Sequence, residues 1–148
     1  MFTLCQLFQD LDSHDGKRVT IRATFRFGQE VSGFYSAACE KRVMLDGHEI
    51  QPHVWADFSM TPNGSRNLDP AVADAKTKPI AIVLIVTGTL RTHNAQVAQP
   101  DGTQMAVRMF GHLGAFPAEL RVEKIDKIEI STNGDQPPAN FDSDKIRR

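Results

Sequence analysis

Between Lys17 and Gly28 the sequence reads KRVTIRATFRFG, in which apolar and polar residues alternate with a period of two. A period of two puts one set of side chains on each face of an extended strand. The apolar face would carry Val19, Ile21, Ala23, Phe25 and Phe27. Because a half-apolar strand must bury one face, this segment predicts a sheet folded around a core.

Further segments predict the other strands of that sheet. Ile80–Val86, IAIVLIV, is a continuous apolar run typical of a strand buried on both faces, and Thr87–Leu90 extends it. Shorter candidates are Val31–Ser36, Arg42–Leu45, His53–Phe58, Gln104–Phe110 and Leu120–Ile130. In the last of these the apolar phase shifts near Glu123, which predicts a β-bulge.

Two short helices are predicted beside these strands. Thr3–Leu11 has Thr3 as its N-cap and Gln6 as the capping-box partner, and its apolar residues fall on one face. A second helix begins with Asp69 as N-cap and Pro70 at the first helical position.

This order of elements favours a mainly β fold: a five- to six-stranded OB-like barrel with a short N-terminal helix and a helix between the third and fourth strands. Another small β-barrel or a sandwich is the alternative. The 148 residues fit one domain, predicted over residues 1–131. Residues 132–148 are polar, contain proline and lack periodicity, so we expect a disordered tail.

Charge and hydropathy exclude some classes of function. With 17 Lys and Arg against 18 Asp and Glu, the formal net charge is −1, so no bulk field steers the chain to nucleic acid or an anionic membrane. The longest apolar run, Ile80–Val86, is too short to span a bilayer.

The stretch Gly111–Leu120, GHLGAFPAEL, differs from the strands around it. It lacks the Gly-Lys-Ser/Thr of a phosphate loop and the serine of a nucleophile elbow, and no cofactor is predicted. The favoured interpretation is a corner, with Gly111 and Gly114 at positive φ and Pro117 fixing entry into the final strand. The alternative is a binding rim that exposes His112, Phe116 and Glu119.

The remaining polar residues show no metal or catalytic pattern. His48 and His53 flank Pro52 in a predicted loop, without the spacing of a zinc site. No serine or carboxylate pair is marked by a motif. We therefore expect neither a metal site nor catalytic residues, and a hydrolytic enzyme is the least favoured class.

A binding module is the favoured function, with a protein or small ligand as its partner. Its predicted surface is the Val31–Phe58 face together with the Gly111–Leu120 rim. The candidate ligand-binding residues are Arg22, Arg26, Tyr35, Trp55, His112, Phe116 and Glu119. The alternative partner is single-stranded nucleic acid, held by arginine contacts to phosphate and by stacking on aromatic rings.

The two cysteines, Cys5 and Cys39, have two interpretations. They are either small buried apolar residues or one disulfide that ties the N-terminal helix to the barrel.

Two segments resemble an uncharacterised group of bacterial proteins that are often secreted. TLCQLFQDLDSHDGKRVTIRATFRFG is similar to the opening of that group, a helix with an early cysteine followed by xGKxVxVRGxF, and GHLGAFPAEL to its glycine–proline corner. The resemblance covers about residues 3–131 and implies an OB-like barrel, a Cys5–Cys39 bridge and export from the cytoplasm, but no catalytic residues. The chain departs from the group at Ala23-Thr24, where a glycine often follows the arginine, and its N-terminus does not read as a signal peptide.

Overall fold

The computed structural model describes residues 1–28, 31–36, 43–45, 48–50, 52–92, 96–98, 100–106, 110–111 and 116–132. The predictions for Cys39, His112, Gly114 and residues 133–148 lie outside these ranges.

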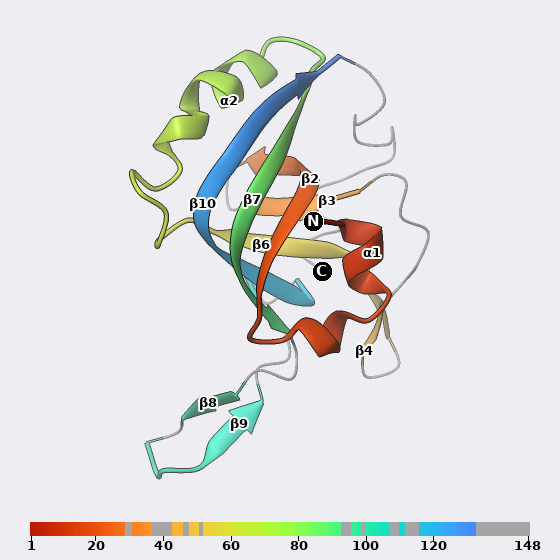
Figure 1. The fold of residues 1–148 in the computed structure, drawn as a ribbon, viewed down its shortest axis with the longest axis vertical. Coiled ribbons are helices and arrows are strands. Elements are labelled where there is room, and N and C mark those ends of the chain that lie inside the picture. The colour runs from red at the N-terminus through yellow and green to blue at the C-terminus, as the bar shows by residue number, and fades with distance from the viewer. Residues whose placement is uncertain are drawn as a thin grey trace.

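The fold is mainly β, as predicted, and six strands form its main sheet (Figure 1). They are β1 (Phe2–Thr3), β2 (Arg18–Gly28), β3 (Val31–Tyr35), β6 (His53–Asp57), β7 (Ala81–Thr92) and β10 (Ala118–Ser131). Their order is β1-β2-β3-β6-β10-β7, and a further pairing of β2 with β7 closes five of them into a ring.

The ring is not a regular barrel, because its strands pair over very different lengths. β10 and β7 are antiparallel and pair from Ala118 to Ser131, with register shifts at Val122/Lys124 and Ile125/Lys127. β10 and β6 are parallel and pair only over Glu119–Arg121. The first shift confirms the β-bulge expected near Glu123.

Two small antiparallel pairs lie outside the ring. β4 (Val43–Leu45) pairs with β5 (His48–Ile50), and β8 (Gln96–Ala98) pairs with β9 (Gln104–Ala106). In Figure 1 the β8–β9 hairpin extends away from the ring. The strand predicted over Gln104–Phe110 therefore does not join the main sheet in its described part, and Phe110 instead forms an isolated bridge with Phe116.

The core is filled by the residues whose alternation predicted a buried face. Phe34, Val54, Leu84 and Leu120 are almost fully buried, and they belong to four different strands of the ring. The predicted apolar face of β2 is buried from Val19 to Phe25, while Phe27 packs against the core and stays partly exposed.

The N-terminal helix is shorter than predicted. α1 spans Leu4–Phe8, and its capping box is confirmed by bonds from the Gln6 N–H to Thr3 Oγ1 (3.2 Å) and from the Thr3 N–H to Gln6 Oε1 (2.9 Å). The chain then continues into a 3-10 turn, η1 (Leu11–His14), where the Ser13 hydroxyl donates to the Asp10 carbonyl. The predicted apolar face is nonetheless buried over its whole length: Leu4, Leu7, Phe8 and Leu11.

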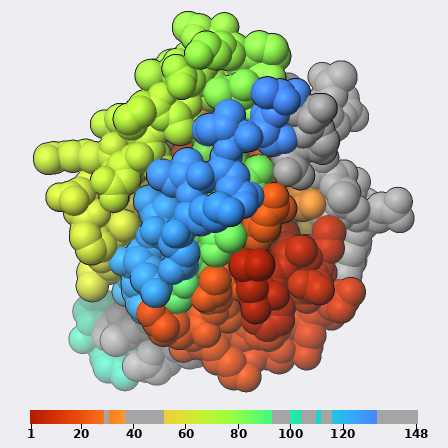
Figure 2. All heavy atoms as spheres, turned by 45° about the horizontal axis from the view of Figure 1, so that its top comes forward, coloured from red at the N-terminus to blue at the C-terminus, as the bar shows by residue number. Residues whose placement is uncertain are grey.

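The second helix, α2 (Asp69–Ala75), confirms the predicted position between the third and fourth ring strands. Asp69 is not its N-cap, however. A 3-10 turn, η2 (Arg66–Leu68), runs directly into the helix, so that buried Leu68 occupies the cap position and Asp69 lies in the first turn. Figure 2 shows this part of the chain beside β10, with the N-terminal residues on the opposite side of that strand.

The described residues include no helix long and apolar enough to cross a bilayer.

Candidate functional site

Four strands place a row of side chains across the outer face of the sheet. Gly33 of β3 is the partner of Trp55 of β6, Trp55 is the partner of Glu119 of β10, and Glu119 is the partner of Arg91 of β7. The structure therefore brings together two predicted site residues, Trp55 and Glu119, and adds Gly33 and Arg91.

Phe116 packs onto this row at Gly33. A Cβ at Gly33 would lie 2.8 Å from the Phe116 ring, so the absence of a side chain makes room for that ring. The Phe116 ring also meets His53 and Trp55 edge to face, with centroid distances of 4.4 and 5.1 Å. Phe116 is 1% exposed, so it does not form the exposed rim that the sequence offered as an alternative.

The corner interpretation of Gly111–Leu120 is confirmed where the chain is described. The Phe110 and Phe116 backbones exchange hydrogen bonds of 2.8 and 3.0 Å, which hold these two residues side by side. Gly111 has φ +75°, as expected, and a Cβ there would lie 2.6 Å from the Trp55 ring. Glycine is thus required both for the backbone conformation and for the contact.

Glu119 is the carboxylate of this row. Burial raises its pKa above the usual value, and the Arg91 guanidinium, 3.6 Å away, opposes that rise. A raised carboxyl pKa means that the folded protein takes up a proton before the unfolded chain does. The contribution of Glu119 to stability therefore falls as the pH rises through its folded pKa.

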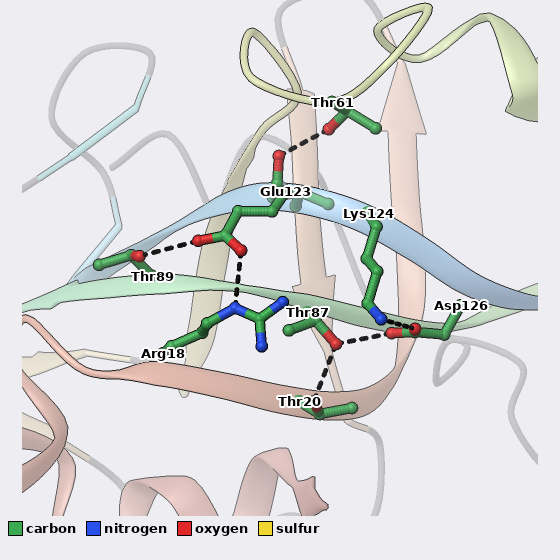
Figure 3. Close-up of polar contacts among 9 residues, drawn as sticks. Arg18, Thr20, Thr61, Thr87, Thr89, Glu123, Lys124 and Asp126 are labelled. Atoms are coloured by element: carbon green, nitrogen blue, oxygen red, sulfur yellow. Dashed lines mark hydrogen bonds and ion pairs between the residues drawn. The ribbon is translucent and has the colours of Figure 1, made fainter.

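Arg22 lies apart from this row, in a polar network on β2, β7 and β10. Its guanidinium donates to Glu129 Oε2 over 3.0 and 3.2 Å, and Lys127 contacts the other oxygen of Glu129 at 3.0 Å. Arg18 pairs in the same way with Glu123 at 2.7 Å (Figure 3). These arginines connect β2 to β10 across β7, which lies between the two strands, and the predicted role of Arg22 in phosphate binding stays a prediction.

Arg26 and Tyr35 are found in a different place, a cavity of about 270 Å³ that we call the polar hollow. Thr24 and Lys78 also line it, and its apolar wall comes from the start of β7. Thr24 and Tyr35 are register partners on β2 and β3, and Arg26 follows along the same face of β2. The hollow thus opens at the point where β2 separates from β7.

A larger cavity of about 490 Å³, here the apolar groove, adjoins the polar hollow between α2 and the β2–β3 end of the ring. Its apolar walls are Phe25, Phe27, Val31, Phe58, Leu68 and Val72. Ser32, Ser65, Asp69 and Lys76 supply its polar groups. The two cavities share Phe25 and Phe27.

Sequence reasoning missed the groove because its walls come from distant segments. Val31 and Phe58 lie at the two ends of the predicted binding face, whereas Leu68 precedes the second helix and Val72 belongs to it. The signal that was present is Val72 on a short helix that begins at Asp69-Pro70, since such a helix needs a surface to cover.

The cysteine prediction needs a correction. Cys5 is a half-buried free thiol, with its Sγ 4.0 Å from the Ser36 hydroxyl. The chain has one other cysteine, Cys39, outside the described residues. The Cys5–Cys39 bridge implied by the resemblance is therefore not formed in the structure, and Cys5 packs as a small, weakly polar side chain.

Metal ligands are also not gathered in the described part of the chain, where no group of three or more His, Cys, Asp or Glu side chains could hold an ion.

No family model matches the chain, and comparison with curated proteins and with solved structures found no similar protein.

Proposed function

We propose that this chain is a small β-barrel binding module that holds a small ligand in the apolar groove between α2 and the β2–β3 end of the ring. The observation that carries the proposal is the groove itself. Its volume of about 490 Å³ lies within the range of small-molecule sites. Apolar walls with a few polar groups at the edge are also typical of such sites.

The groove is the best-supported site because the candidate residues on the outer face of the sheet line neither of the two cavities. Phe116 fills the outer face at Gly33, and Arg22 lines neither the groove nor the hollow. The groove, in contrast, leaves apolar side chains facing an unfilled volume of the protein. An apolar ligand in the groove would remove its own apolar surface and that of the groove walls from water.

The type of barrel is part of the same proposal. The ring order β2-β3-β6-β10-β7, the parallel β6–β10 pair and the helix between β6 and β7 support an OB-type arrangement. Proteins of that architecture use the face of their second and third strands for binding, and β3 and β6 are those strands here. The groove lies at one end of that face, where Val31 and Phe58 line it.

The test uses an uncharged fluorescent probe, N-phenyl-1-naphthylamine, with the full-length chain. We expect saturable enhancement of probe fluorescence, which Val72→Arg abolishes because it places a long charged side chain in the groove. Ala73→Arg is the matched control, since it adds the same charge to an exposed position of the same helix and leaves the groove open. Both variants are compared at equal thermal stability.

Equal binding to the two variants, or no saturable binding to the parent chain, would overturn the proposal. Oligonucleotide binding with a steep salt dependence and no response to Val72→Arg would favour the nucleic-acid alternative instead.

A further inference from the structure

The apolar groove and the polar hollow adjoin beneath α2 and the segment that follows it, and a path for an extended ligand would run from one to the other. Phe25 and Phe27 line both cavities, so the two cavities meet at these residues. The segment from the end of η2 through α2 to the residues just after it supplies the opposite wall, from Leu68 in the groove to Lys78 in the hollow.

The chemistry changes along this path. The groove is walled by three phenylalanines and three aliphatic side chains, with Asp69 and Lys76 at its edge. The hollow is lined by the cations Arg26 and Lys78 and by the hydroxyl-bearing Thr24 and Tyr35, and none of its described lining residues carries a carboxylate. One end of the path is therefore suited to hydrocarbon and the other to an anion.

The ion pair of Lys78 does not prevent this role. Its Nζ lies 3.7 Å from Asp74, and both side chains are about 60% exposed. Such exposed pairs contribute little to stability and are readily exchanged for another anion. Arg26 is half-buried and offers a planar guanidinium, whose fork of donors matches the two oxygens of a carboxylate.

We propose that the ligand is a single-chain amphiphile with a terminal carboxylate, such as a medium-chain fatty acid. Its alkyl chain lies in the apolar groove, and its carboxylate lies in the polar hollow between Arg26 and Lys78. This inference rests on the proposed function, because it names the ligand class of the same groove.

The experiment compares three probes that share a ten-carbon chain: decanoate, 1-decanol and decyltrimethylammonium, each below its micellar concentration. Binding to the full-length chain is followed by amide chemical shifts of Phe25–Gly28, Val72 and Ile80. We expect decanoate to bind about tenfold more tightly than decanol, as a charge-assisted hydrogen bond implies, and the cationic probe to bind most weakly.

Lys78→Gln reduces the preference for decanoate over decanol, and it does so at an exposed residue where folding is not at risk. Arg26→Gln has a larger effect of the same sign, measured after its thermal stability has been matched. Arg22→Gln is the control, because Arg22 lies in the ion-paired network on the outer face of β2.

The possible outcomes separate the two proposals. If all three probes shift the groove amides with similar affinity and Lys78→Gln has no effect, the groove binds ligands but the carboxylate assignment is wrong. If none of the probes produces saturable shifts, both the proposed function and the carboxylate assignment are wrong. A decanoate preference that Lys78→Gln and Arg26→Gln remove supports both.

Discussion

At the scale of single residues, Gly88 sets how closely β7 approaches β10. A Cβ at Gly88 would fall on the Arg121 carbonyl oxygen and within 2.9 Å of Val122 Cα. These are backbone atoms at the first bulge of β10, which Thr61 also holds through a 2.7 Å hydrogen bond to the Val122 carbonyl (Figure 3). β10 therefore has little freedom to move away from β7.

We predict that Gly88→Ala destabilises the fold by about 3 kcal/mol, the upper part of the range for overpacking a close contact. Gly28→Ala is the matched control in β2, where a Cβ meets nothing within 4 Å and φ is not positive. It should be neutral or stabilise by a few tenths of a kcal/mol. Urea denaturation gives the free energy of unfolding of each variant. Similar losses of stability in the two variants would show that the β7–β10 contact is looser in solution than in the structure.

The carboxylates of the polar network lead to a second prediction, which concerns the dependence of stability on pH. The Thr87 hydroxyl donates to Asp126 over 2.7 Å and, with Lys124 nearby, lowers the Asp126 pKa. Because the Thr87 hydroxyl proton is directed to Asp126, the Thr20 hydroxyl is the donor in the 2.8 Å bond between Thr20 and Thr87. Hydrogen bonds from Arg18 and from Lys127 lower the pKa of Glu123 and of Glu129, respectively.

Lowered carboxyl pKa values stabilise the fold above the unfolded pKa of about 4, and this contribution is lost as the pH falls through the folded pKa. We therefore expect the urea midpoint to fall between pH 5 and pH 3. In a variant that combines Glu123→Gln, Asp126→Asn and Glu129→Gln, the urea midpoint should fall less over that pH interval. If the urea midpoint of the triple variant falls as much as that of the parent, the hydrogen bonds to these three carboxylates do not stabilise the fold.

At the scale of elements, the described ends of the corner, Phe110 with Gly111 and Phe116 with the residues after it, pack on the sheet. Phe116 is enclosed by Gly33, His53 and Trp55, and its backbone is tied to Phe110. The sequence predicted a corner from two glycines and a proline, which determine local conformation. It did not reveal that Gly33, in the middle of a predicted strand, marks the place where the corner packs.

Phe116→Ala should destabilise the fold by about 3–5 kcal/mol, as for other buried phenylalanines. Phe2→Ala is the comparison, because Phe2 is only partly buried and contacts His14 at a centroid distance of 4.9 Å. Chemical denaturation should give a clearly smaller loss for Phe2→Ala. Equal losses would mean that Phe116 does not pack on the sheet in solution.

The helices show where local sequence signals are sufficient and where they are not. The capping box of α1 depends on Thr3 and Gln6, three residues apart, and was predicted correctly. The start of α2 was misplaced by one residue, because the burial of Leu68 extends the preceding turn into the helix. Burial of that kind depends on distant strands and cannot be deduced from a local pattern.

At the scale of the whole molecule, alternation predicted which side chains form the core but not how the strands close around it. β2 was identified from its period of two, and β7 from its continuous apolar run. The parallel pairing of β6 with β10 joins residues more than sixty positions apart and has no local signature. The curled sheet also brings Phe58, which follows β6, beside Phe25 of β2 with a centroid distance of 5.7 Å, and both residues line the groove.

The most direct test of the account is therefore a measurement of ring closure in solution. Nuclear Overhauser effects between backbone protons of Ala56 and Leu120 report the parallel β6–β10 pair, and those between Ile21 and Val86 report the β2–β7 pair. The account predicts both sets in the full-length chain. Observation of the β2–β7 contacts without any between Ala56 and Leu120 would show an open sheet and contradict the closed ring beneath the proposed binding groove.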